Sequence, residues 1–373
     1  VQSHPRLNTV DFSANGSIWA QTEHPWQPPR PAPLFKDMCV SKKHNGSLER
    51  PVPVLDLPLR HLDEQRFRFI EVLAQQEMQT GQIELYHDLQ QDCKVVGKRM
   101  FRSWTRSSPE EFEENHPELL ESPWKELALN HFVASTSQKG VCKSFGAFED
   151  EGDIILFLEY IPGGDLHELA RRCATEPGPE REAKAWPVIL SLLGAVRSLH
   201  QLGVAHGDIS LENALLGPDG EVRLVDFAAA VTDIRTKGVR GKPSYQAPEM
   251  HTLDSYDPCA ADLFACGVFA YCLAVADYPW RSTSSSKCAA FDFFMEHGLP
   301  AFLAQRKLRF RDTARRPVET VLSRKLTRVL TVLLDPVPEK RQAVWQELWD
   351  QQKPLVEVQD SSTVHTLFAL KVN

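Results

Sequence analysis

The chain has 373 residues, of which 42% are hydrophobic and 25% charged, the make-up of a globular protein. Its formal net charge of −8, without a long basic run, argues against nucleic acid as a partner. The eight cysteines form no CxxC pairs, so the sequence indicates neither a zinc site nor a disulfide framework and favours a reducing, cytoplasmic compartment. The longest apolar run, residues 266–276, is about half the length of a membrane span, so we expect a core helix and no membrane span.

The N-terminal part, residues 1–62, is rich in proline and has no sustained helix or strand period, so we expect an extended or disordered arm. Residues 25–33 could form polyproline II and bind an SH3-like partner, although most proline-rich tails are only linkers. Because the chain begins with Val rather than Met, we also expect that its N-terminus is incomplete and that a targeting signal is missing with it.

The pattern of residues 63–160 predicts a small β-rich lobe. Strands are expected at 67–74, 82–89, 93–100, 140–148 and 153–160, and one helix is expected near 122–133. Six glutamates between positions 110 and 121 mark an insertion in this lobe. Charge runs of this kind are usually solvated, so the sequence assigns the insertion no role.

Beyond residue 160 apolar residues recur at spacings of three to four, which predicts a larger, mainly helical lobe over residues 161–350. Helices are expected over 186–202, 263–275 and 322–334. The predicted fold class is therefore α+β, with two lobes. The remaining tail, residues 351–373, contains a candidate strand at 364–372 whose partner the sequence does not identify.

Residues 206–213, with the sequence HGDISLEN, and Asp226, thirteen residues after Asn213, predict a phosphoryl-transfer site. Asp208 would be the base that accepts a hydroxyl proton. Asn213 and Asp226 would supply hard-oxygen ligands for Mg²⁺. Phosphoryl transfer depends mainly on positioning and charge neutralisation, so these three side chains can perform much of the chemistry.

The spacing of these residues resembles that in eukaryotic protein kinases, and further elements of the family follow in order over about residues 64–350. An Ala-Pro-Glu sequence ends at Glu249, and Asp262 opens an apolar helix with Gly267 five residues later. Arg341 takes the place of the arginine that pairs with Glu249 in the family. The resemblance implies a bilobal kinase fold with ATP and Mg²⁺ as cofactors.

A kinase of this family also needs a lysine on the third strand of the small lobe and a glutamate on its helix. Lys98, at the end of the sequence VVGK, takes the place of the lysine that binds the phosphates of ATP. Glu126 is the expected partner of this lysine, and Glu118 and Glu121 compete with it for that role. We therefore expect a Lys98–Glu126 pair beside the nucleotide.

The resemblance also implies an adenine slot built from apolar side chains and from the backbone between the lobes. The expected residues are Ile83 and Val96 above the ring, Leu215 below it, the gatekeeper Leu158, and the backbone of Glu159 and Ile161 at the adenine edge. Val96 is bulkier than the usual Ala and would narrow the slot.

The glycine-rich loop of the family is incomplete here. Gln76, Met78 and Gly81 stand where its three glycines are expected, so only the last glycine is present. Side chains at the first two positions obstruct a close approach of backbone amides to phosphate. Nucleotide binding should then depend more on Lys98, on the metal and on burial of the adenine.

Two further departures from the family are coupled. Kinases that act on Ser or Thr carry a lysine two residues after the catalytic aspartate and a threonine near the A-P-E sequence. Here these positions hold Ser210 and Lys242. Because the local need for positive charge is unchanged, we expect Lys242 to reach back to Asp208 and Ser210, although an exposed loop lysine is the simpler alternative.

The resemblance implies a protein kinase that transfers the γ-phosphate of ATP to Ser or Thr. Gly207 and Ala228 replace the family's Arg and Gly beside the two aspartates. A pseudokinase scaffold is the main alternative, favoured by the incomplete glycine loop. A small-molecule kinase of the aminoglycoside or choline type is a remote one, because such enzymes share the HGD…N…D spacing but not the later elements.

Asp165 and Glu212 resemble the acidic pair that lines the substrate groove in kinases favouring Arg or Lys before the acceptor. The resemblance therefore implies a protein substrate with basic residues before the phosphorylated Ser or Thr. Asp165 has an alternative role as the N-cap of a helix starting at residue 166, a position where aspartate is common.

Overall fold

The computed structural model describes residues 39–41, 51–53, 57–76, 80–136, 139–173, 175–343 and 345. Most of the proline-rich arm lies outside these residues, including residues 25–33, which could bind an SH3-like partner. The tail at 351–373, with its candidate strand, also lies outside them. Within the first 62 residues, where the sequence predicts no strand, β1 (Cys39–Ser41) pairs antiparallel with β2 (Pro51–Pro53).

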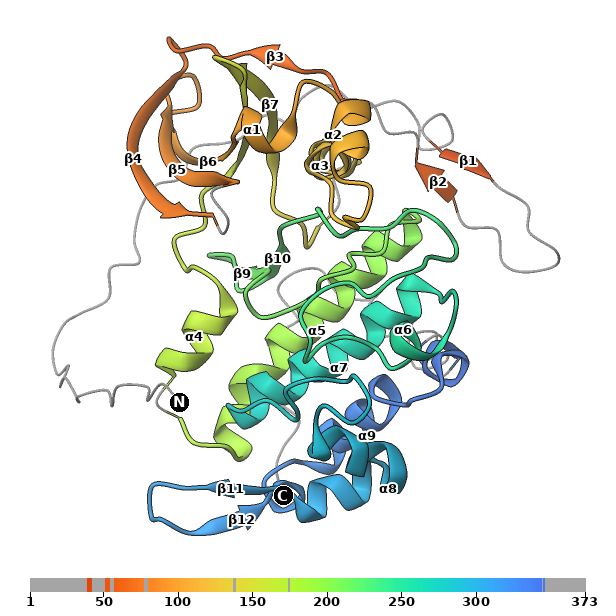
Figure 1. Ribbon diagram of the computed structural model, residues 1–373. Helices are drawn as coiled ribbons and strands as arrows, with labels where there is room; N and C mark the ends of the chain where they lie inside the picture. The colour runs from red at the N-terminus through yellow and green to blue at the C-terminus, as the bar shows by residue number, and fades with distance from the viewer. Residues whose placement is uncertain are drawn as a thin grey trace, which may run out of the picture. The chain divides into compact units, whose positions relative to one another are not determined.

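A six-stranded sheet forms the first lobe, in the order β3-β7-β8-β6-β5-β4 (Figure 1). Five of its strands confirm the predicted ones: β4 (Phe67–Gln75), β5 (Gly81–Asp88), β6 (Cys93–Met100), β7 (Ser144–Asp150) and β8 (Asp153–Glu159). These five pair antiparallel, whereas the short edge strand β3 (Arg60–His61) runs parallel to β7.

β7 begins four residues later than predicted, because the chain before it contacts the second lobe. Gly140 has a φ of +84°, and a Cβ there would lie 2.3 Å from the Cβ of Ala195. The backbone N–H of Cys142 donates to the carbonyl of Leu224 at 2.9 Å. This segment therefore ties the sheet to the helical lobe.

The glutamate-rich insertion is folded. Its elements are α1 (Arg102–Thr105) and α2 (Pro109–Asn115), and the predicted helix follows as α3 (Pro123–Ser135). The rings of Trp104 and Phe112 pack edge to face, with 5.1 Å between centroids. The indole N–H of Trp124 donates to the carbonyl of Thr105 at 2.8 Å, so α1 is bound directly to α3.

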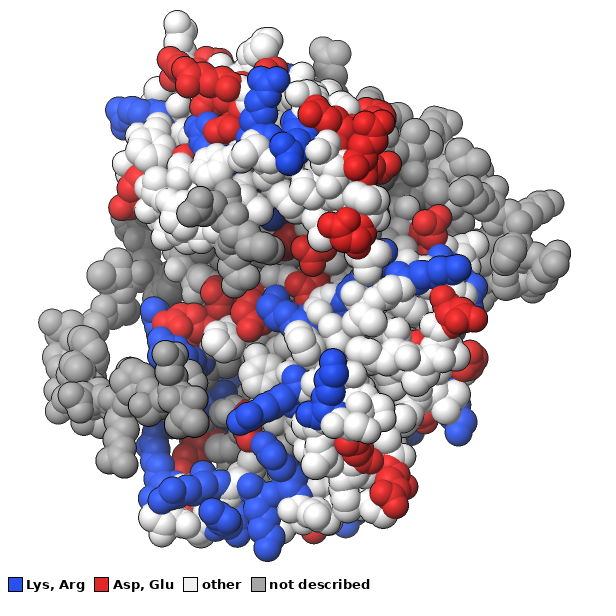
Figure 2. Space-filling view, in the orientation of Figure 1, with Lys and Arg blue, Asp and Glu red and all other residues white. Residues whose placement is uncertain are grey.

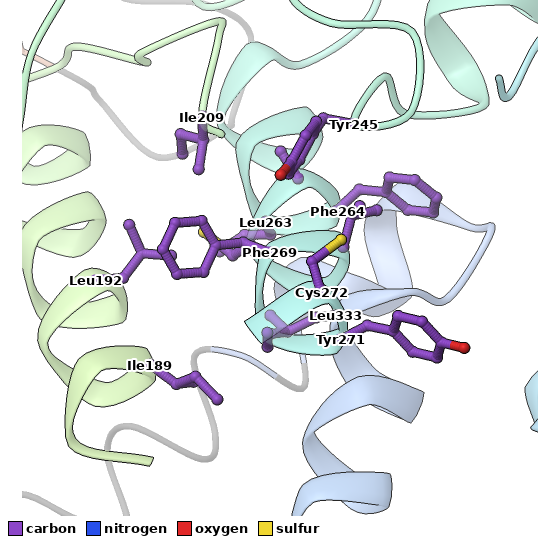
Figure 3. Packing of buried hydrophobic residues seen from close by; sticks show 14 of the residues in the cluster. Ile189, Leu192, Ile209, Tyr245, Leu263, Phe264, Phe269, Tyr271, Cys272 and Leu333 are labelled. Carbon is purple, nitrogen blue, oxygen red and sulfur yellow. The ribbon is translucent and has the colours of Figure 1, made fainter. Parts of the chain in front are cut away.

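The second lobe is mainly helical and confirms the three predicted helices. These are α5 (Pro179–Gln201), α7 (Pro258–Val275) and α9 (Arg324–Leu333). They enclose the largest hydrophobic cluster, in which Figure 3 shows Leu192, Phe269 and Leu333. Among the described residues, α7 alone is long and apolar enough to cross a membrane, but all its residues are buried inside the lobe.

Shorter elements complete the second lobe. They are α4 (Leu166–Arg172), β9 (Ala214–Leu216), β10 (Val222–Leu224), α6 (Glu249–Thr252), α8 (Ala289–Gln305), β11 (Lys307–Arg309), β12 (Arg315–Pro317) and η3 (Val318–Thr320). β9 and β10 form the hairpin between Asn213 and Asp226. The N–H of Val225 donates to the carbonyl of Asn213 at 3.0 Å, which brings the two predicted metal ligands to the same end of the hairpin.

Candidate active site

The loop that carries Asp208 is anchored on α7. Asp262, buried in the first turns of that helix, accepts from the backbone amides of His206 and Gly207 at 2.7 and 2.9 Å. Gly207 has a φ of +79°, and a Cβ there would lie 2.3 Å from the carbonyl oxygen of Ala229. The backbone therefore requires glycine where the family usually has arginine.

The carboxylate of Asp208 is contacted from both sides. Asn213 donates from Nδ2 to Oδ2 at 2.7 Å. Lys242 donates its backbone N–H to Oδ1 at 3.0 Å and its Nζ to Oδ2 at 3.2 Å. The close approach depends on Gly241, whose φ is +71° and whose Cβ would lie 2.8 Å from Oδ1. The Asp208 side chain is held in one orientation and is still 17% exposed, so an acceptor hydroxyl can reach it.

Lys242 also reaches Ser210, as the sequence suggests. Its Nζ donates to the Ser210 hydroxyl at 3.1 Å, and Ser210 is fully buried. The lysine therefore lies between the two residues that it was expected to contact and is not a loop side chain pointing to solvent. Its part in phosphoryl transfer stays a prediction.

The predicted pair of Lys98 and Glu126 is formed. Lys98 Nζ lies 2.7 and 2.8 Å from the two carboxylate oxygens of Glu126 and 3.3 Å from Asp226 Oδ1. Burial opposes the charge on Lys98, but Glu126 and Asp226 outweigh it and raise the pKa of the ammonium. Glu118 and Glu121 are not bonded to Lys98 in the described part of the chain. β6 and α3 are thereby joined beside Asp226.

Asn213 and Asp226 fit a magnesium site. The Asn213 amide donates to Asp208 through its nitrogen, which orients its oxygen as an acceptor. Burial opposes the charge on Asp226, but Lys98 and the Ala228 amide hold its pKa below the ordinary value. Mg²⁺ in phosphoryl-transfer sites is bound through one or two protein oxygens together with substrate phosphates, and these residues provide that set. In Figure 2, acidic and basic side chains gather where the two lobes meet.

The residues expected at the adenine slot share one face of the sheet. Ile83 lies opposite Lys98, and Val96 lies opposite Leu158 in the strand register. Residues directly opposite in antiparallel strands project to the same side, as do residues two apart in one strand. Ile83, Val96 and Leu158 therefore lie on the same face of the sheet as Lys98, whose ammonium contacts Asp226 of the second lobe.

The floor and the edge of the slot come from the second lobe and the connection to it. Leu215 packs against the apolar cluster that contains Leu158 and Ile161. The Ile161 N–H has no hydrogen-bond partner in the described part of the chain, and the Glu159 carbonyl accepts a long hydrogen bond from the Cys142 thiol, at 3.7 Å. Both backbone groups can therefore bind an adenine edge.

The glycine of the incomplete loop has a packing role. A Cβ on Gly81 would lie 2.0 Å from the carbonyl oxygen of Arg99, so glycine is required where β5 pairs with β6. The backbone N–H of Gln76 donates to the Gly81 carbonyl at 3.0 Å. Met78 lies outside the described residues. The one glycine present is thus explained by strand pairing.

The ion pair that the sequence predicts between Glu249 and Arg341 is formed in the second lobe. Glu249 and Arg341 form a fully buried ion pair, and Arg341 Nε also donates to the carbonyl of Ala260 at 3.1 Å. Removing one partner of such a pair leaves a buried charge, at a cost of about 3–5 kcal/mol. The pair therefore fixes the end of the segment that starts at Asp226.

The two expected groove residues differ in their contacts. Asp165 accepts from the backbone N–H of Glu168 at 2.8 Å and is the N-cap of α4, so its helix-capping role is present. The Glu212 carboxylate interacts with the Tyr278 hydroxyl, and its buried Oε2 has no hydrogen-bond partner among the described residues. A buried, unpaired carboxylate oxygen favours a cationic ligand. Asp165 is therefore a helix-capping residue, and Glu212 is the candidate for binding a cationic group.

Sequence reasoning missed the contacts between the insertion and the segment after Asp226. Arg240 donates to the carbonyl of Leu120 at 2.7 Å, and the N–H of Ser122 donates to the carbonyl of Ala228 at 3.1 Å. The acceptors are backbone carbonyls, which any residue supplies. No residue pattern could have indicated this interface.

Comparison with known families agrees with this geometry. The model of the protein kinase domain matches residues 80–352. This chain belongs to the protein kinase family. The match includes β5, the Lys98–Glu126 pair, the Asp208 loop, Asp226 and Arg341, and it begins after Gln76 and Met78 of the incomplete glycine loop.

The kinase is also similar to curated proteins. It is 31% identical over 197 residues to CBL-interacting protein kinase 4 of Oryza sativa subsp. japonica, covering 51% of this chain and 39% of the relative. It is 32% identical over 199 residues to Aurora kinase C of Mus musculus, covering 51% and 70%. Serine/threonine-protein kinase ppk8 of Schizosaccharomyces pombe shares 29% over 168 residues, covering 43% and 32%. Most of these alignments span less than two thirds of the relative's length.

Proposed function

We propose that this kinase is catalytic and transfers the γ-phosphate of ATP to Ser or Thr hydroxyls of proteins in the presence of Mg²⁺. The observation that carries the proposal is the Asp208 carboxylate, which is oriented by Asn213 and by Lys242 while the Lys98–Glu126 pair is formed. A scaffold has no chemical need for this complete arrangement. The similar proteins named as serine/threonine kinases support the same substrate class.

Each side chain has a defined task in this proposal. Asp208 accepts a hydrogen bond from the acceptor hydroxyl, orients its oxygen, and takes the proton as transfer proceeds. Lys242 stabilises the charge that develops on the transferring group, because its ammonium lies 3.2 Å from Asp208. Lys98 binds phosphate oxygens of ATP and is kept charged by Glu126. Bound to Asn213 and Asp226, Mg²⁺ would neutralise phosphate charge.

The proposed substrate is a protein segment with Arg or Lys before the acceptor. Support comes from Glu212, whose buried Oε2 lacks a partner in the described part of the chain. A charge-assisted bond from a guanidinium would satisfy that oxygen. The SH3-like partner of residues 25–33 and the cytoplasmic location stay proposals from the sequence.

The pseudokinase alternative is favoured by one observation, because Gly81 is explained by strand packing and not by phosphate binding. The experiment that separates the two is phosphoryl transfer by purified protein with Mg-ATP and a generic Ser/Thr peptide mixture, alongside the Asp208→Asn variant. Transfer that disappears in the variant supports catalysis. Equal phosphate incorporation by wild type and Asp208→Asn would come from a contaminating kinase. That result would favour the scaffold.

A further inference from the structure

Arg240 lies at an interface between two parts of the chain that are far apart in sequence. One is the insertion, residues 101–122, and the other is the activation segment, residues 226–249. Arg240 Nη1 donates to the carbonyl of Leu120 at 2.7 Å, and its Nη2 donates to the Thr236 hydroxyl at 3.3 Å. The guanidinium thus binds the insertion and its own segment at once.

The same interface is closely packed. Gly238 has a φ of +79°, and a Cβ there would lie 2.6 Å from Cδ1 of Leu120. From the other side, the buried Tyr256 donates from its hydroxyl to the Gly238 carbonyl at 2.8 Å. The backbones of Tyr256 and Thr236 also exchange two hydrogen bonds, at 2.9 and 3.0 Å. Residues 236–240 are therefore held between the insertion and the helical lobe.

The insertion makes a second contact, at the start of the activation segment. The backbone N–H of Ser122 donates to the carbonyl of Ala228 at 3.1 Å, two residues after Asp226. Ser122 is also the N-cap residue of α3, which carries Glu126. One short stretch of the insertion therefore connects α3 to both ends of the loop that follows Asp226.

The segment that Arg240 binds is followed closely by Lys242, the residue that contacts Asp208 in the catalytic loop. Gly241 follows Arg240, and the next residue, Lys242, binds Asp208 through both its backbone N–H and its Nζ. A shift of Arg240 must therefore move Lys242 unless Gly241 absorbs it. Gly241 has little freedom to do so, because a Cβ built on it would lie only 2.8 Å from both Asp208 Oδ1 and the Gly207 carbonyl oxygen.

We infer that Arg240 is a positioning residue: by binding the Leu120 carbonyl, it uses the insertion to hold Lys242 over Asp208. This inference rests on the proposed catalytic function. It assigns a role to the insertion, whereas the sequence alone assigns the insertion none. It also explains how the segment is ordered without an arginine at position 207, where the backbone admits only glycine.

The test compares Arg240→Ala and Arg240→Lys with wild type, using Lys237→Ala as a matched control on the exposed side of the same segment. Arg240→Ala should lower kcat about ten- to a hundredfold while KM for ATP changes little, because the phosphate-binding residues are not moved. Arg240→Lys keeps one donor and should recover part of kcat. Lys237→Ala should match wild type.

Amide hydrogen exchange supplies a readout that does not depend on activity. Arg240→Ala should speed exchange in residues 116–122 and 236–245 together, and Lys237→Ala should not. Unchanged exchange in either region, or faster exchange with unchanged kcat, overturns the inference. If wild type transfers no phosphate, the proposed function fails, and exchange alone then decides whether Arg240 holds the segment.

Discussion

Lys242 Nζ lies 3.2 Å from Asp208 Oδ2 and 3.1 Å from the Ser210 hydroxyl, so a lysine of the activation segment occupies the place beside the catalytic aspartate. Ser210 stands where kinases of this type usually carry a lysine. The positive charge is thus retained, but it comes from the activation segment instead of the catalytic loop. Ser210 is fully buried, and its hydroxyl accepts from the Lys242 ammonium.

Removing the Lys242 side chain should therefore slow phosphoryl transfer. Lys242→Ala should lower kcat by roughly 10²–10³, in line with loss of a preorganised charge. Ser210→Lys in that background should restore part of the loss, because the space left by Lys242 adjoins the Ser210 side chain. Steady-state kinetics of the single and double variants measure both effects. An unchanged kcat in Lys242→Ala would show that the contact has no catalytic part.

Activity should not require phosphorylation of the activation segment. Kinases that are switched in this way grip the phosphate with an arginine before the catalytic aspartate, and Gly207 leaves no room for a side chain. Protein treated with phosphatase should keep its full transfer rate, although Thr232, Thr236 and Ser244 carry hydroxyls. Loss of activity on treatment, followed by recovery on rephosphorylation of Thr236, would overturn this prediction.

Substitutions of Glu212 and Asp165 should have different effects on the sequence preference measured with a positional peptide library. Wild type should enrich Arg or Lys two to five residues before the acceptor, with each charged hydrogen bond contributing about 1.5–3 kcal/mol. Glu212→Ala should weaken this preference. Asp165→Ala should mainly lower the free energy of unfolding, by about 0.5–2 kcal/mol, because Asp165 caps α4. A flat or acidic preference in wild type would rule out the groove assignment.

His200 should stabilise the fold in a pH-dependent way. Its Nε2 lies 2.9 Å from Asp262 Oδ2. Burial opposes the charge on the imidazole, but Cys259 and Asp262 raise its pKa from 6.5 to about 10. A raised pKa means that the stabilisation is fully present below pH 6.5 and is lost as the pH rises towards about 10.

The comparison of wild type with His200→Gln tests this linkage. The difference in free energy of unfolding should be largest below pH 6.5 and should shrink as the pH rises towards about 10. Denaturant titrations at several pH values measure it. A difference that stays constant, or grows with pH, would mean that His200 is neutral in the folded protein.

The sequence predicted the parts of the fold whose patterns are local. The five strands and α3, α5, α7 and α9 have regular apolar periods, and the order of Lys98, Glu126, Asp208 and Asp226 indicated the site. It did not predict α8, because Gly298, with a φ of +78°, interrupts the helical period. The glutamate run predicts a solvated insertion, since nothing in it indicates the buried Phe112 or the carbonyl contact of Leu120.

The central claim is that Asp208 makes this chain a catalyst. The most direct measurement is γ-phosphate transfer from ATP to a peptide by wild type, Asp208→Asn and Asp226→Asn, together with nucleotide binding by each protein at varied Mg²⁺ and Mn²⁺. Wild type should transfer phosphate, Asp208→Asn should lose nearly all transfer while keeping nucleotide binding, and Asp226→Asn should lose metal-dependent binding. Absence of transfer by wild type under all these conditions would contradict the claim.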